Sequence, residues 1–129
     1  MEKQIHSKFK VFTATPDSNG GIPEDIHLAM NGFIALNKVA VKSVGVEYVE
    51  SINKIVISLG YVEGQDSYAV VLQPVHLGKF GIDKDSNLTK DLEEALTKAA
   101  ETQDNSVICH EFYVDKDGNY IALFLRAVK

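Results

Sequence analysis

The strongest restriction on the fold is the order in which strand and helix signals follow one another along the chain. A β-prone, partly alternating segment is followed by a helical segment and then by two more β-prone segments, and this order occurs twice. The expected strands are 8–15, 39–50, 54–62, 67–75, 106–114 and 119–128, and the expected helices begin at Pro23 and Leu88.

Both expected helices have a recognisable beginning and an apolar stripe. The first opens with Pro-Glu-Asp at 23–25, because proline is tolerated at a helix start and carboxylates favour its positive end. Gly32 lies inside this helix, at a cost of about 1 kcal/mol relative to alanine. Asn87 or Thr89 is placed to cap the second helix. The apolar stripe of the second helix consists of Leu88, Leu92, Ala95, Leu96 and Ala99.

This order predicts an α+β protein with a single domain over residues 1–129. Its halves, at about 7–64 and 67–128, are each one β-α-β-β unit and form a tandem repeat. The segments 43–49 and 106–114, which follow the two helices, are similar once two residues are gapped, which favours an internal duplication. We expect one curved antiparallel sheet of about six strands with two helices on one face, which leaves the other face free of helices.

Composition excludes several classes of protein. Hydrophobic residues make up 45% of the 129 residues, which is enough for a core and too much for a disordered chain. Cys109 is the only cysteine, so a disulfide scaffold is excluded and a cytoplasmic location is expected. No apolar run approaches the roughly 20 residues of a membrane span, and residues 1–10 are too polar for a signal peptide. The net charge of -5 and the single arginine, Arg126, argue against nucleic acid as a partner.

The last hairpin has two possible registers. With a four-residue turn, Val114 pairs with Asn119, and a core face under the helices is formed by Ile108, Phe112, Ile121 and Leu125. The other face then carries Cys109, Glu111, Tyr113, Tyr120, Ala122 and Phe124. A three-residue turn with Gly118 in a bulge shifts the register by one and places Glu111 beside Leu123.

Glu111 is the centre of the candidate site in either register. A glutamate in mid-strand is disfavoured, and where it is partly buried it has to be paired or protonated. Glu47 occupies the matching point of the first half. We interpret these residues as part of a concave pocket for a cationic or hydrogen-bonding organic ligand. The alternative is an ordinary cross-strand pair with Lys or Arg on a solvated face. The candidate ligand-binding residues are Glu111, Tyr113, Tyr120, Phe124, Glu47 and Tyr48.

As topology, the tandem β-α-β-β order resembles the effector-binding domains related to the bacterial DNA gyrase inhibitor protein. The resemblance covers nearly the whole chain, through the units at about 7–64 and 67–128, and includes no sequence motif. It implies a protein that binds small, often cationic or aromatic molecules in the cleft between its repeats, in some members with a buried glutamate. No residue role is carried over from it.

Cys109, His110 and Glu111 are consecutive, but we do not expect them to form a catalytic group. Side chains alternate along a strand, so Cys109 and Glu111 point to one face and His110 to the other. The remaining histidines show no zinc-ligand spacing with His110, and phosphate-loop, nucleophile-elbow and dinucleotide-binding motifs are absent from the sequence. The sequence therefore predicts no catalytic residue, no metal site and no cofactor.

The expected function is that of a soluble, non-enzymatic binding domain with a small-molecule ligand on the helix-free face of the sheet. The alternative is an interaction protein that uses this face for homodimerisation or for another protein partner. A small enzyme is the lesser alternative, and it would require His27 or His76 to lie within hydrogen-bond reach of Glu111 or Cys109. Neither nucleic acid nor a membrane is an expected partner.

Overall fold

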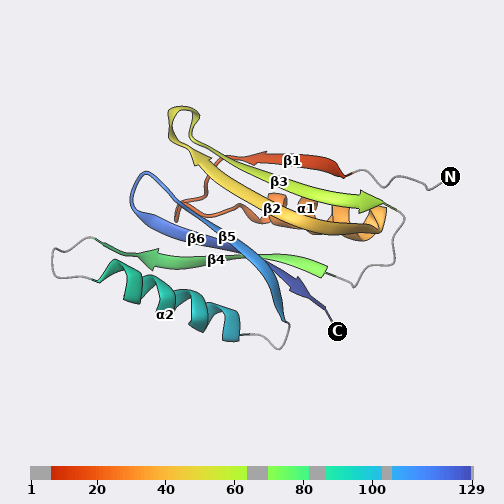
Figure 1. Cartoon of the computed structure of the whole chain (residues 1–129). Helices are drawn as coiled ribbons and strands as arrows, with labels where there is room; N and C mark the ends of the chain where they lie inside the picture. Colours follow the sequence, from red (N-terminus) through yellow and green to blue (C-terminus); the bar gives the residue numbers. More distant parts are fainter. Residues whose placement is uncertain (1–6, 64–69, 82–86, 103–105, 129) are drawn as a thin grey trace.

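The order of elements expected from the sequence is confirmed by the structure (Figure 1). The computed structural model describes residues 7–63, 70–81, 87–102 and 106–128, and within them the chain is α+β. The elements are β1 (Lys8–Ala14), α1 (Glu24–Asn37), β2 (Val39–Val49), the short 3-10 helix η1 (Glu50–Ile52), β3 (Lys54–Glu63), β4 (Val70–Lys79), α2 (Leu88–Glu101), β5 (Val107–Val114) and β6 (Asn119–Ala127).

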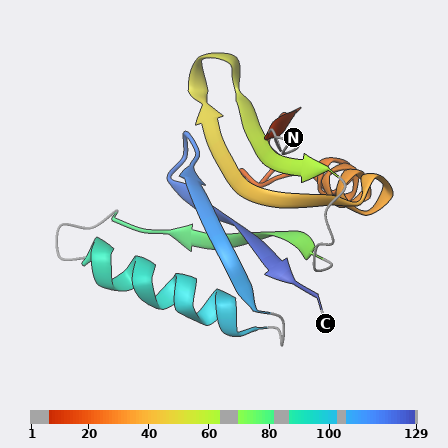
Figure 2. The same cartoon turned by 45° about the vertical axis from the view of Figure 1, so that its right-hand side comes forward.

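The six described strands form two antiparallel sheets of three strands, where we expected one continuous sheet. The first sheet has the order β1-β3-β2 and the second the order β4-β6-β5, so each half of the chain places its last strand in the centre. The edge strands β2 and β5 lie side by side without being paired to each other in the described residues. Each of them contains a bulge, between Val41 and Ser43 and between Val107 and Cys109. Bulges bend and twist a strand, which explains why the ladder stops between these edges (Figure 2).

The two helices pack on opposite faces of the second sheet, where we expected them on one face. Met30 and Ile34 of α1 are buried in the main core, together with Leu123 of β6. Ala99 of α2 is buried in a smaller cluster with Phe124, on the other face of β6. The reason lies in the central strand β6, which is apolar on both faces from Ile121 to Leu125 and therefore needs cover on both.

The free edge of β4 is covered by α1. Asn31 of α1 accepts a hydrogen bond from the Leu72 N–H at 2.8 Å and donates to the Leu72 carbonyl at 3.0 Å. Nε2 of His27 donates to the same carbonyl at 2.9 Å. The outward-facing backbone groups of Leu72, which an edge strand would otherwise leave unpaired, are satisfied in this way.

Strand β4 continues beyond residue 75, where we expected this strand to end. It runs through Pro74 to Lys79, and Pro74 pairs with Leu123 of β6. Because Pro74 lies two residues after Leu72, its missing N–H falls on the same outward side of this edge strand and removes no bond to β6. Residues 67–69, expected at the start of the strand, lie outside the described residues.

The last hairpin adopts the second of the two registers. Val114 pairs with Tyr120 and Glu111 with Leu123, while Gly118 has a φ of 86°. The first register, with Ile108 and Phe112 in the core, is therefore wrong. The two side chains are 53% and 38% exposed, respectively. The shift follows from the turn, whose bulged geometry lets one carboxylate satisfy two backbone N–H groups, as described below.

Candidate functional site

The structure does not bring the six candidate ligand-binding residues together. In the hairpin of β5 and β6, Glu111 and Tyr113 are paired with Leu123 and Ile121 and share the face that turns toward the main core. Phe124 lies on the opposite face, in the cluster under α2, and Tyr120 shares that face because strand side chains alternate. No single pocket can therefore be lined by all four of these β5 and β6 residues.

The two candidates on β2 are also separated from each other. Neighbouring strand residues point to opposite faces, and Glu47 is exposed while Tyr48 is half-buried. The Tyr48 hydroxyl donates to Oδ1 of Asn53 at 2.8 Å, across the turn between β2 and β3. Glu111 is exposed as well, so neither candidate glutamate is buried.

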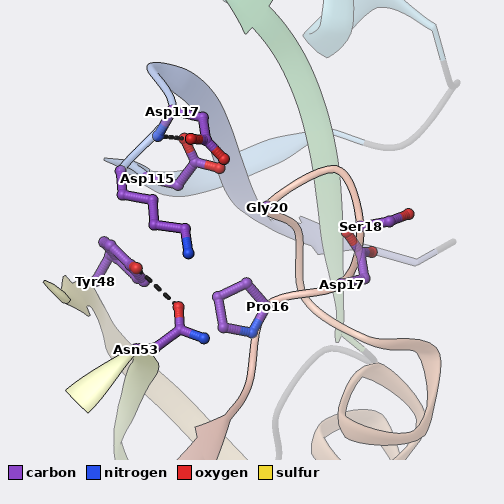
Figure 3. Close-up of a pocket in the computed structure, with 9 residues that line it drawn as sticks. Pro16, Asp17, Ser18, Gly20, Tyr48, Asn53, Asp115 and Asp117 are labelled. Atoms are coloured by element: carbon purple, nitrogen blue, oxygen red, sulfur yellow. Dashed lines mark hydrogen bonds between the residues drawn. The ribbon is translucent and has the colours of Figure 1, made fainter.

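The turns of the two hairpins lie at the same end of the molecule (Figure 1). A hollow of about 230 Å³ lies between them (Figure 3). It is bounded by the loop between β1 and α1, the turn between β2 and β3, and the turn between β5 and β6, and we call it the three-loop hollow. Its lining residues are Pro16, Asp17, Ser18, Gly20, Tyr48, Asn53, Asp115, Lys116 and Asp117.

The loop between β1 and α1 is shaped by Asp17. Its Oδ1 accepts hydrogen bonds from the backbone N–H groups of Asn19 and Gly21, both at 2.9 Å. Its own backbone N–H and carbonyl bond to Gly21 and Gly20 at 3.0 Å each. Asp17 thus organises a tight turn with one carboxylate oxygen, and its side chain remains exposed at the rim of the hollow.

The turn between β5 and β6 is shaped by Asp115 in the same way. Its Oδ1 accepts from the N–H groups of Asp117 at 2.9 Å and Asn119 at 2.7 Å, and its Oδ2 accepts from the Asn119 side chain at 2.9 Å. Burial acts to raise the pKa of Asp115, but these hydrogen bonds and the charge of Lys79 outweigh it, so the pKa lies below its usual value. Asp115 is therefore ionised at neutral pH and holds the turn.

Tyr113 ties these two loops together. Its hydroxyl donates to the Gly20 carbonyl at 2.9 Å in a buried hydrogen bond between residues 93 positions apart. Gly20 has a φ of 81°, and a Cβ added there would collide with the Asp115 carboxylate. Burial raises the pKa of the Tyr113 hydroxyl well above its usual range, and the nearby charges of Asp17 and Asp115 raise it further. Tyr113 remains neutral and acts as a donor beneath the three-loop hollow.

The hollow carries an excess of negative charge. Three aspartates, Asp17, Asp115 and Asp117, and one basic residue, Lys116, are among the residues that line it. In the described residues the Asp117 carboxylate makes no hydrogen bond and no ion pair, and its side chain is exposed. The arrangement therefore offers carboxylate acceptors and a tyrosine ring to a molecule a few atoms across.

The residues considered for catalysis are dispersed. Register confirms that His110, paired with Phe124, lies on the face opposite Cys109 and Glu111. His27 bonds to the Leu72 carbonyl, as described above, and His76 bonds to Oδ1 of Asn119 at 3.0 Å. Burial, followed by the charge of Glu111, raises the pKa of the Cys109 thiol, which is the opposite of activation.

Sequence reasoning recognised the acidic lining residues only as turn formers. The patterns Asp-Ser-Asn-Gly at 17–20 and Asp-Lys-Asp-Gly at 115–118 are typical of turns, and both do form turns. What the sequence does not contain is the long-range contact of Tyr113 with Gly20, which places these turns beside each other.

Across the described part of the chain, no group of three or more His, Cys, Asp or Glu side chains could hold a metal ion. The same residues include no helix that is long and apolar enough to span a membrane. The chain matches no protein-family model, no curated protein and no solved structure.

Proposed function

We propose that the chain is a non-enzymatic binding domain that holds a small cationic organic molecule in the three-loop hollow. The observation that carries this proposal is that three aspartates line one hollow, Asp17 from the loop between β1 and α1 and Asp115 and Asp117 from the turn between β5 and β6. The volume of this hollow, about 230 Å³, is below the roughly 300–1,000 Å³ of sites for drug-sized ligands. The expected ligand is therefore a small amine or guanidine rather than a large aromatic compound.

The charges of the lining residues support a cation as the ligand. The Asp117 carboxylate is not used by the turn, and the Asp17 carboxylate uses only Oδ1, so these two side chains retain oxygens for a ligand N–H group. Tyr48 can offer its ring face to an alkylammonium group. Lys116 would be displaced toward solvent by a bound cation, because like charges repel at short range.

This proposal keeps the ligand class expected from the sequence and changes the place where it binds. The three-loop hollow takes two of its loops from the first half of the chain and one from the second. A site between the halves is also what the resemblance to effector-binding domains implies. Of the six candidate residues, Tyr48 lines this hollow, and Tyr113 supports it from below. The lone Cys109 supports a reducing compartment such as the cytoplasm.

Titration of the protein with agmatine, spermidine and choline, followed by amide chemical shifts in NMR spectra, tests the proposal. We expect shift changes confined to the three loops, and Asp117→Asn to weaken binding about 5–10-fold by removing one exposed carboxylate contact. Glu47→Gln and Glu111→Gln remove the same charge outside the hollow and serve as matched controls. If binding is lost in either control and kept in Asp117→Asn, the ligand binds at the sheet residues Glu47 or Glu111 and not in the three-loop hollow.

A second candidate function, that of a protein-interaction module, is favoured by a row of exposed apolar side chains on β5. Ile108, Phe112 and Val114 alternate along the strand on one face, and all three are exposed. The Phe112 ring lies 6.1 Å from that of Tyr120, which in turn lies 5.5 Å from Phe80, so the row continues into an aromatic surface. Affinity capture from source cells, compared between wild type and Phe112→Lys, tests it, since a partner of this row is lost only in the variant.

A further inference from the structure

Helix α1 differs from α2 in the surface that it presents to solvent. In α2 the exposed positions after Leu88 are polar, for example Glu93, Thr97 and Lys98. In α1 no Asp, Glu, Lys or Arg occurs between Asp25 and Lys38. An apolar face of a helix is normally packed against another part of the protein or a partner. The solvent-facing side of α1 is therefore the unexplained surface of this molecule.

We define the α1 outer face as the residues Leu28, Ala29, Gly32, Ala35 and Leu36. With about 100° per residue, they occupy about 120° of the helix circumference, opposite the buried residues Met30 and Ile34. Leu28 is 63% exposed and Leu36 is 85% exposed. A Cβ at Gly32 would meet no atom within 4 Å, so this position opens outward. Figure 2 shows α1 at the periphery, on the side away from α2.

We propose that the α1 outer face binds the same face of a second copy of this chain, with the two helices antiparallel and crossing at Gly32. The face is symmetric about this residue, because alanine lies three positions and leucine four positions away in both directions. A two-fold axis at Gly32 therefore places Leu28 of one copy against Leu36 of the other. The missing side chain at Gly32 allows the two backbones to approach closely at the axis.

The charges at the ends of α1 favour the antiparallel arrangement. Glu24 and Asp25 form the first turn, and Lys38 follows the last turn in a left-handed conformation. In an antiparallel pair the acidic turn of each copy lies beside Lys38 of the other, and the helix dipoles are opposed. A parallel pair would instead bring the two acidic turns together. A second copy thus satisfies both the apolar centre and the charged ends of this face.

The size of the face predicts a weak, reversible dimer. A helix of 14 residues is about 21 Å long, and one such pair buries less than the roughly 1,200 Å² of a standard-size interface. We therefore expect a dissociation constant in the micromolar range, with monomer and dimer in rapid exchange.

Sedimentation velocity on the full chain, from about 1 μM to about 1 mM, tests this proposal. Wild type should pass from monomer to dimer in this range. Leu36→Glu should raise the dissociation constant by at least about 100-fold, because the two-fold axis introduces the charge twice. Thr97→Glu, an equal change on the exposed face of α2, should behave as wild type. Circular dichroism and Tm should show that each variant is folded, since Leu36 and Thr97 are both exposed.

The decisive variant carries Leu28→Lys and Leu36→Glu on one chain. In the antiparallel dimer each new lysine faces a new glutamate, so dimerisation should return to within about 10-fold of wild type. Each outcome decides the proposal. The proposal is overturned if the wild-type protein stays monomeric over this range. If that monomeric protein also cosediments with phosphatidylcholine vesicles, the α1 outer face binds lipid instead. A dimer that survives Leu36→Glu, or one that the double variant fails to restore, overturns the proposal as well.

Discussion

Replacing Tyr113 by phenylalanine isolates the contact that holds the three-loop hollow together. The substitution removes one hydroxyl and keeps the ring, which is buried among the apolar residues of the main core. The hydroxyl is the donor to the Gly20 carbonyl at 2.9 Å, and Gly20 is itself buried. Phenylalanine therefore leaves a carbonyl without this donor in a place where water has little access.

The expected loss of stability follows from this burial. Removing one partner of a buried hydrogen bond costs about 1–3 kcal/mol, and we take about 1.5 kcal/mol for a neutral pair. With about 2.1 cal/mol/K per residue over 129 residues, the unfolding entropy is about 0.27 kcal/mol/K. The Tm of Tyr113→Phe should therefore fall by roughly 5–6 °C.

The pH dependence gives a second, independent signature. The pKa of Tyr113 is raised in the folded protein above its ordinary value of 10.0, so the native state holds this proton longer than the unfolded state does. The stabilisation is complete below pH 10.0 and is lost as pH rises above it, with a limiting slope of about 1.4 kcal/mol per pH unit. This component of the slope should be absent from Tyr113→Phe, so the two stability curves should converge in alkali.

Urea denaturation of both proteins, at neutral pH and above pH 10, measures the two effects. Tyr48→Phe is the matched control, because its hydroxyl bonds to Asn53 in an exposed turn where water can replace the partner. We expect the control to lose less than about 0.5 kcal/mol. If Tyr113→Phe is as stable as wild type, or if its stability falls with pH as steeply, the assigned role of this hydroxyl is incorrect.

Three further predictions concern other positions. Gly32→Ala should raise Tm by about 3–4 °C in dilute solution, because the added Cβ meets no atom and helix propensity improves by about 1 kcal/mol. Gly20→Ala should instead lower the free energy of unfolding by more than about 2 kcal/mol, because Gly20 has a positive φ and the added Cβ collides with Asp115. Differential scanning calorimetry compares these two. Asn31→Ala should cost about 1–3 kcal/mol by uncovering the Leu72 N–H, and an amide at Leu72 that still exchanges slowly would contradict this. Asp115→Asn should destabilise at neutral pH, with a difference that shrinks as pH falls below 3.8 through the lowered pKa, as urea titrations at several pH values would show.

Local signals in the sequence were sufficient to predict the order of the elements and most of their ends, the end of β4 being an exception. Asn87 caps α2 as expected, with its side chain accepting from the Lys90 N–H at 3.1 Å. The turn at 115–118 lies where expected, with Gly118 at positive φ. These features depend on contacts within four residues, which a sequence pattern reports directly.

The division into two sheets could not be predicted by the same means. Alternation places residues on two faces, but it does not say which face turns toward which helix. In β6 both faces are apolar, so the pattern allows α2 on either side. The register depended on the bonding of one carboxylate, that of Asp115, and a shift by one residue moved Ile108 and Phe112 from the expected core to solvent.

The sequence directed attention to the sheet rather than to the three-loop hollow for a related reason. A strand glutamate such as Glu111 is noticeable in a sequence because it conflicts with its local environment, and it drew the prediction to the sheet. The aspartates of the three-loop hollow agree with the local preferences of their segments, because aspartate is favoured in turns and Asp17 and Asp115 both lie in turns. Their importance arises only when Tyr113 joins the two turns, a contact that no local pattern contains.

The same reasoning distinguishes the three-loop hollow from the α1 outer face. The three-loop hollow obeys every local preference, so only the structure could locate it. The α1 outer face violates two of them, with a glycine in mid-helix and exposed leucines on either side of it. If these residues destabilise the monomer, either they stabilise another state of the chain, such as the dimer, or they only lower the stability of the protein. Gly32→Ala discriminates between these possibilities. If Gly32 lies at the dimer axis, the substitution should stabilise the monomer and weaken the dimer. If Gly32 has no role in association, the substitution should stabilise the monomer and leave association unchanged.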